Sequence, residues 1–84
     1  MSKTINSWER KNNKLEREFT FKSFGAAVSF IMDVAKISEI ESHHPEIYNY
    51  YTKVKIAFST LDKVTTKDHE LSKLIDDLYT ERYL

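Results

Sequence analysis

Two adjacent histidines, His43 and His44, are the residues of this 84-residue chain best suited to moving protons. An imidazole with its ordinary pKa of about 6.5 can give or take a proton at cellular pH. Pro45 follows the pair and disfavours a helical conformation at His44. A helix arriving from upstream should therefore end near this point. We expect the pair at a helix-to-strand junction, where side chains can converge on a pocket.

Taken alone, such a pair is more often an ordinary junction than a catalytic centre. A metal site is disfavoured, because adjacent histidines rarely point at one ion and the chain has neither cysteine nor a His-x-x-x-His spacing. Glu39 and Glu41 could act as general bases, although a solvated helix end is the simpler interpretation. A tyrosine cluster could stack on a flat heterocycle, but it more often forms sheet surface or a subunit contact: Tyr48, Tyr50 and Tyr51.

Length and composition indicate a single domain over residues 1–84. Such a small domain buries only about 60–65% of the surface that its unfolded chain exposes, and oligomerisation is a common remedy. Thirteen basic residues balance thirteen acidic ones, which argues against nucleic acid or an acidic membrane as the main partner. No apolar run approaches a membrane span of roughly 20 residues. The absence of cysteine fits a cytoplasmic protein.

Four strands are predicted from alternation and composition. Residues 8–11 favour a short strand, and Asn12-Asn13 favours a turn because asparagine tolerates positive φ. Residues 14–21 alternate with period two, although Arg17 interrupts the apolar face. Residues 46–51 are rich in β-favouring aromatics. Residues 53–61 form the clearest strand, and the short link between these last two segments predicts an antiparallel hairpin.

Two helices are predicted by apolar spacing. Ser23 is a candidate N-cap for the first, whose expected apolar stripe is Phe24, Ala27, Val28, Ile31, Val34 and Ala35, widened by Phe30, Ile37 and Ile40. The second follows Thr65 and Asp68, which have the outline of a capping box. It carries Leu71, Leu74, Ile75 and Leu78 toward Tyr83. The order β-β-α-β-β-α predicts an α+β domain of two layers, with a four-stranded antiparallel sheet and both helices on one face.

With these segments in place, the chain resembles the pterin-4a-carbinolamine dehydratase family, also known as the dimerisation cofactor of a homeodomain transcription factor. The motifs that carry the resemblance run in order through the chain: Phe24-x-x-Ala27-x-x-Phe30-x-x-x-Val34, Glu41-Ser42-His43-His44-Pro45, Asn49-x-Tyr51-x-x-Val54-x-Ile56 and Ser59-Thr60. They span roughly residues 8–78, and the His-His-Pro element at this spacing is the most specific of them.

The resemblance implies a homodimer or homotetramer and a lyase that removes water from 4a-hydroxytetrahydropterin, recycling the tetrahydrobiopterin cofactor of aromatic amino acid hydroxylases. It implies no metal and no organic cofactor. His43 becomes the first choice for general acid/base catalysis, with His44 as a second proton carrier or a group that orients the substrate. The positions implied to contact the pterin are Ser42, His43, His44, Ser59, Thr60, Leu61 and Asp62.

Several residues depart from the family pattern. Leu61 stands where the family usually has a third active-site histidine, and the loop over residues 62–64 is shorter and lacks the usual glycine. Ser42 replaces an aspartate or asparagine, and Ile47 a tryptophan. His69 lies one residue beyond Asp68, which matches the aspartate that opens the family's last helix. We do not expect His69 to replace the absent histidine, although it could.

Three functions remain open on the sequence. The first is a dehydratase that works with His43 and His44 and is slowed by Leu61. The second is a non-catalytic module that binds a pterin or another protein and has lost the reaction. The third is an enzyme that acts on another pterin, such as that of molybdenum cofactor metabolism. Positioned acid–base catalysis contributes about 10²–10⁴-fold, so loss of one histidine could weaken the enzyme without changing its fold.

Overall fold

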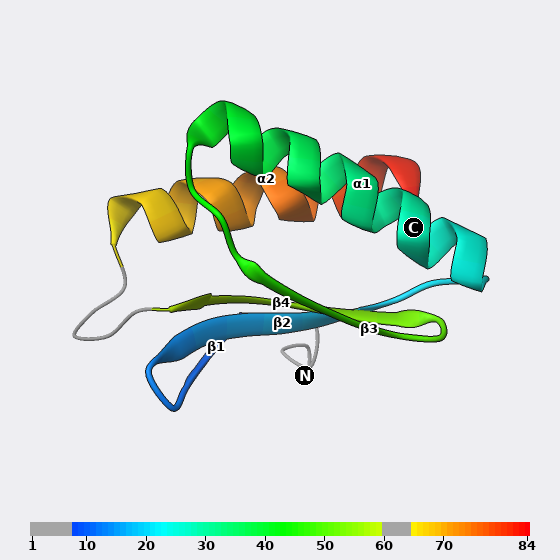
Figure 1. Cartoon of the computed structure of the whole chain (residues 1–84), viewed down its shortest axis with the longest axis horizontal. Coiled ribbons are helices and arrows are strands. Elements are labelled where there is room, and N and C mark those ends of the chain that lie inside the picture. Colours follow the sequence, from blue (N-terminus) through cyan, green and yellow to red (C-terminus); the bar gives the residue numbers. More distant parts are fainter. Residues whose placement is uncertain (1–7, 60–64) are drawn as a thin grey trace.

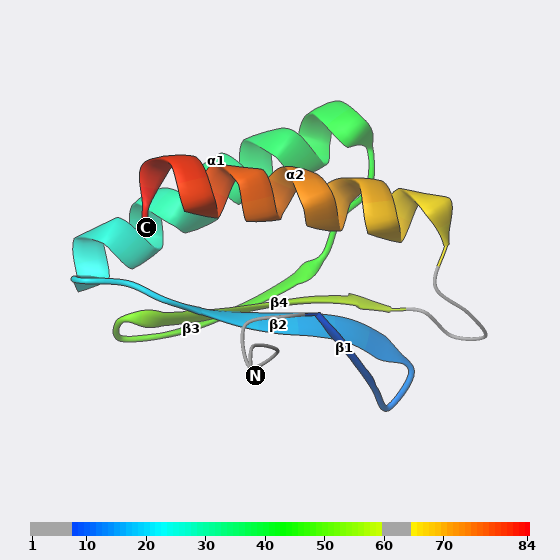
Figure 2. The same ribbon diagram turned by 180° about the vertical axis from the view of Figure 1, so that it is seen from behind.

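The computed structural model describes residues 8–59 and 65–84, which form a two-layer α+β domain. The elements follow in the order β1 (Glu9–Lys11), β2 (Lys14–Thr20), α1 (Phe24–Glu41), β3 (Glu46–Tyr50), β4 (Lys53–Ser59) and α2 (Thr66–Arg82). Both helices lie on the same side of the sheet, and none of the described elements covers its other side (Figures 1 and 2). The predicted fold class is confirmed.

The sheet has the strand order β1-β2-β4-β3, and every neighbouring pair is antiparallel. Asn12 and Asn13 both adopt positive φ, at 51° and 62°, and close the two-residue β1–β2 turn. This left-handed geometry matches the twist of a tight hairpin, and asparagine tolerates it better than most residues. Tyr51, with φ of 56°, turns the chain between β3 and β4. Both predicted hairpins are therefore present.

Each helix begins at the residue that its sequence predicts. The Ser23 side chain accepts a hydrogen bond from the Ala26 backbone N–H at 3.1 Å, and α1 follows. In the capping box of α2, the Thr65 hydroxyl accepts from the Asp68 backbone N–H, and the Asp68 carboxylate accepts from the Thr65 N–H. Each bond satisfies an N–H that has no partner within the helix.

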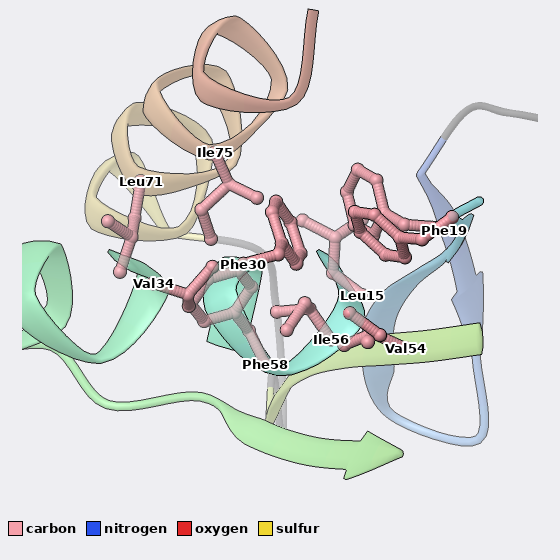
Figure 3. Close-up of a cluster of buried hydrophobic side chains, with 11 residues drawn as sticks. Leu15, Phe19, Phe30, Val34, Val54, Ile56, Phe58, Leu71 and Ile75 are labelled. Atoms are coloured by element: carbon pink, nitrogen blue, oxygen red, sulfur yellow. The ribbon is translucent and has the colours of Figure 1, made fainter. Parts of the chain in front are cut away.

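The core lies between the helices and the sheet. Phe30 and Val34 of α1 and Leu71 and Ile75 of α2 point toward strand residues in one cluster (Figure 3). The strand residues of that cluster have the predicted parity: Leu15, Phe19, Val54, Ile56 and Phe58. The partly buried Trp8 packs against the same cluster, with its ring centroid 5.7 Å from that of Phe58.

The apolar stripe predicted for α1 was partly wrong. The buried line is Ala27, Phe30, Val34 and Ser38, whereas Phe24 is 52% exposed, Val28 37% and Ile40 78%. The line through Ala27, Phe30 and Val34 faces the sheet, and Phe24 and Val28 lie to one side of it. Apolar residues are numerous on this helix, so their spacing alone did not fix which line faces the core.

Arg17 interrupts the apolar face of β2 because α2 supplies a partner for it. Its guanidinium lies 4.3 Å from the Phe19 ring centroid and donates to Asp76 Oδ1 at 2.6 Å. Trp8 Nε1 donates to the same carboxylate oxygen at 2.9 Å. The interruption of the apolar face therefore does not leave β2 without cover, because the mostly buried guanidinium has a carboxylate partner on the helix above it.

The face of the sheet opposite the helices, called the open face below, carries alternating charges joined in ion pairs, one within β1 and three between strands. Four lysines each pair with a glutamate: Lys11 with Glu9, Lys14 with Glu46, Lys53 with Glu18 and Lys55 with Glu16. Tyr48 and Tyr50 are exposed on this face, which supports the interpretation of the tyrosines as sheet surface. Surface pairs of this kind contribute little stability, but they neutralise the face.

Candidate functional site

His43 is placed by the end of α1. The helix stops at Glu41, and Ser42 takes a left-handed conformation with φ of 53°. The His43 backbone N–H then bonds Ser38 O at 3.1 Å, and the Ser42 N–H bonds Glu39 O at 3.3 Å. This pair of bonds is the Schellman pattern, which fixes the path of the residue after the left-handed one. The backbone position of His43 is therefore fixed by these two hydrogen bonds, independently of its side-chain contacts.

The left-handed conformation of Ser42 leads to a stability prediction. A non-glycine residue pays about 1–2 kcal/mol in this region, whereas glycine adopts it without strain. Ser42→Gly should therefore raise the free energy of unfolding by up to about 1 kcal/mol in urea titration. Lys36→Gly, at an exposed position inside α1, should lower it by about 1 kcal/mol. A loss of stability in Ser42→Gly would show that the serine side chain, rather than its backbone, holds this junction.

The His43 side chain lies between two elements distant in sequence. Its Nε2 is 2.7 Å from Asp68 Oδ1 at the first turn of α2. Its ring stacks on Phe58 of β4, with centroids 5.3 Å apart and planes within 10°. The imidazole is 29% exposed, while the Asp68 side chain is 1% exposed. His43 is thus half-buried, with one edge on a buried carboxylate and one face on a core aromatic.

The end of α1 lies beside the start of α2, which is what brings His43 to Asp68 (Figures 1 and 2). Lys67 Nζ on α2 also reaches Glu41 Oε1 on α1, at 3.4 Å. Sequence reasoning recognised Asp68 as a helix cap but missed its contact with His43. The Thr65-x-x-Asp68 pattern marks where α2 begins, and only the packing of the two helices shows which side chain its carboxylate meets.

The electrostatics of Asp68 favour its ionised form. Burial alone would raise the pKa of this carboxyl, but hydrogen bonds from the Thr65 backbone N–H and from His43 outweigh burial and hold the pKa below its ordinary value. One oxygen accepts from Thr65 N at 2.9 Å and the other faces His43. The site therefore pairs an imidazole with a buried carboxylate anion.

This lowered pKa predicts how stability depends on pH. The folded state binds a proton at Asp68 less readily than the unfolded state does, so the stabilisation is present above the unfolded pKa of about 3.9 and is lost as pH falls through the lower folded pKa. Asp68→Asn should cost about 1–3 kcal/mol at pH 7, and the difference from wild type should shrink in acid. Asp77→Asn, an exposed position of α2, should match wild type at every pH. An Asp68→Asn deficit that stays constant down to pH 2 would contradict the assignment.

His44 occupies a different environment. Its side chain is 61% exposed, and its Nε2 lies 3.1 Å from Glu39 Oε2, which is itself 77% exposed. Glu39 therefore sits at a solvated helix end, as the simpler interpretation held, and it also contacts an imidazole. His69 is exposed on α2. The two adjacent histidines thus differ, and His43 alone is bonded to a buried group among the described residues.

Among the described residues, the structure does not gather the other predicted pterin-binding positions around His43. Ser42 is exposed at the turn before the histidines. Ser59 ends β4 on the parity of Lys53 and Lys55, so it lies on the open face of the sheet, whereas Phe58 faces the helices. Thr60, Leu61 and Asp62 lie outside the described residues. The role of these positions in binding stays a prediction.

A hollow of about 430 Å³ lies on the open face of the sheet, lined by residues that include Glu16, Tyr48, Tyr50 and Lys55. None of the predicted site residues lines it, and it is on the opposite side of the sheet from His43. Within residues 8–59 and 65–84 there is no cluster of three metal-binding side chains. Neither described helix has the length and apolar character needed to cross a membrane.

Comparison with known proteins matches this arrangement to one family. The family model described as pterin 4 alpha carbinolamine dehydratase matches residues 1–78. A protein of Prochlorococcus marinus (strain NATL2A), provisionally named a pterin-4-alpha-carbinolamine dehydratase, is 43% identical over 74 residues, covering 86% of this chain and 78% of its own. A protein of Sulfolobus acidocaldarius with the same provisional name is 38% identical over 76 residues, covering 88% and 84%.

Two solved structures share the fold. The transcriptional coactivator/pterin dehydratase of Brucella melitensis superposes with a TM-score of 0.78 at 26% identity, over 89% of this chain and 84% of that one. A pterin dehydratase-like protein, described as a RuBisCO assembly factor of the α-carboxysome, superposes with a TM-score of 0.72 at 24% identity, over 84% of each chain, which is a likeness of fold alone. Sequence and fold agree, and the chain belongs to the pterin 4 alpha carbinolamine dehydratase family.

Proposed function

We propose that this protein dehydrates 4a-hydroxytetrahydropterin to the quinonoid dihydropterin by histidine acid–base catalysis. The observation that carries the proposal is the 2.7 Å contact between His43 Nε2 and the buried Asp68 carboxylate. A carboxylate that orients an imidazole and stabilises its cation is a recurrent arrangement for proton transfer. Family membership supplies the substrate class.

The reaction asks for two proton movements. The His43 imidazolium gives a proton to the hydroxyl on C4a, the C–O bond breaks, and water leaves. The lone pair of ring nitrogen N5 then forms the C=N bond, and the N5 proton passes to a base. His44 is our candidate for that base, since its exposed ring can exchange protons with solvent. Ser42, Thr60, Leu61 and Asp62 are the proposed contacts to the pterin, whereas Ser59 lies on the face of the sheet that is opposite His43.

A second candidate function is a non-catalytic module that keeps a pterin site or a protein-binding surface. The observation in its favour is Leu61, which lacks the proton-transfer group that the family usually places there. An enzyme acting on a different pterin is a third possibility. It would use the same two histidines, so only a comparison of substrates separates it from the first.

The experiment is to follow the dehydration of freshly made 4a-hydroxytetrahydrobiopterin with wild type, with Leu61→His and with buffer alone, and to measure tetrahydrobiopterin binding by calorimetry. We expect wild type to exceed the spontaneous rate and Leu61→His to exceed wild type. If wild type binds the pterin but does not accelerate its dehydration, the non-catalytic module becomes the better hypothesis. If wild type neither binds the pterin nor accelerates the reaction, both the dehydratase and the pterin-binding module are contradicted.

A further inference from the structure

The His43 ring is fixed by two contacts that constrain different motions. Phe58, itself 2% exposed, lies parallel to the imidazole and sets the plane of the ring. Asp68 Oδ1 engages one atom at the edge, Nε2. A half-turn of the ring would keep the plane but would bring Cε1 to the carboxylate in place of Nε2, losing the hydrogen bond. One orientation of the ring therefore satisfies both neighbours.

The carboxylate also determines which ring nitrogen carries hydrogen. An ionised carboxylate accepts hydrogen bonds and donates none, so the nitrogen beside it must be the donor. Asp68 Oδ2 is engaged with the Thr65 N–H, and Oδ1 faces Nε2. In residues 8–59 and 65–84, the His43 side chain forms its hydrogen bond through Nε2. The second nitrogen, Nδ1, is then the position at which a proton can come and go.

We infer that His43 keeps its Nε2–H on Asp68 throughout and exchanges a proton with the pterin through Nδ1, with Phe58 as the residue that holds the ring plane. The tautomer follows from the geometry of His43, Phe58 and Asp68 alone. The identity of the proton acceptor rests on the proposed function. Phe58 and Asp68 act through His43, so they are positioning residues.

The tautomer is tested first, without any substrate. Nitrogen-15 NMR of the neutral His43 ring should show Nε2 protonated and Nδ1 as a lone-pair nitrogen. Asp68→Asn should reduce this preference, because an amide can donate to Nε2 as well as accept from it. A neutral wild-type ring protonated at Nδ1 would overturn the inference, whatever the enzyme assay shows.

The exchanging atom is tested with tetrahydrobiopterin, a reduced pterin that lacks the 4a-hydroxyl. Its addition should shift the Nδ1 resonance more than the Nε2 resonance. A shift confined to Nε2, or no shift of either nitrogen, would overturn the assignment of Nδ1. If the neutral ring is protonated at Nε2 but the protein does not accelerate dehydration, the proposed function is contradicted, whereas the inferred tautomer of His43 is supported.

The role of Phe58 is tested with a matched pair. Phe58→Leu keeps an apolar side chain but removes the flat face, whereas Phe19→Leu alters an equally buried core phenylalanine that contacts other aromatic rings in tilted and edge-on arrangements. We expect Phe58→Leu to lower kcat about tenfold or more relative to Phe19→Leu, because small displacements of a catalytic group are costly. Phe58→Tyr, which keeps the ring, should restore most of the rate. Equal kcat values in the two leucine variants would overturn the role of Phe58.

Discussion

Replacing His43 by glutamine should lower kcat/KM for 4a-hydroxytetrahydropterin by about 10²–10⁴-fold, the usual contribution of one positioned acid–base group. Glutamine can donate an amide N–H to Asp68, so the buried carboxylate keeps a partner, but an amide does not transfer protons at neutral pH. The variant thus separates chemistry from stability. His43→Ala, by contrast, would leave Asp68 without this donor and could also lower stability.

His44→Gln and His69→Gln are the matched controls. We expect a smaller loss for His44→Gln, because that ring is 61% exposed and its partner Glu39 is exposed too. We expect no loss for His69→Gln, because His69 is exposed on α2 and was not placed in the site. Full activity of His43→Gln, or a greater loss of activity in His44→Gln, would contradict the assignment of His43 as the main acid–base residue.

Replacing Phe30 by alanine should destabilise the protein by about 3–5 kcal/mol. Phe30 is fully buried in the cluster between the helices and the sheet (Figure 3). Its ring centroid lies 4.9 Å from those of both Phe19 and Phe21. Small domains are stable by only about 5–15 kcal/mol in total, so this one change removes a large fraction. The measurement is the free energy of unfolding from urea titration, with circular dichroism reporting the helices.

Phe24→Ala is the control for the same residue type on the same helix. Phe24 is 52% exposed, and its loss should change stability by no more than about 0.5 kcal/mol. Both phenylalanines belong to the apolar spacing of α1, and only the fold tells them apart. Equal losses for the two variants would mean that Phe24 is covered in solution and that this face of α1 has a partner.

The elements of the fold could be predicted closely because local signals agree with one another. Asn12-Asn13, Ser23 and the Thr65–Asp68 box each specify a turn or a helix start through their own backbone geometry. The alternation of β4 gave the core face correctly. The buried residues of α1 were harder to predict from the sequence, because apolar residues surround much of the helix. The rotation of the helix about its axis depends on which of these side chains fit against the sheet.

The site was predictable in part. The His-His-Pro pattern placed the pair at a helix end, and the structure puts His43 there beside a buried partner. The contacts with Asp68 and Phe58 join residues 25 and 15 positions away in sequence, so no local pattern reveals them. The alternation of β4 also predicts the position of Ser59, because the residue that follows Phe58 in a strand points to the face away from the helices.

The most direct test of the account is a crystal structure of the protein with tetrahydrobiopterin bound. We predict the pterin against the helix side of the sheet, with its C4a–N5 edge within hydrogen-bond reach of His43 Nδ1 and with Nε2 still on Asp68. A pterin bound instead in the hollow of the open sheet face, beside Tyr48 and Lys55, would contradict the central claim that His43 transfers the proton.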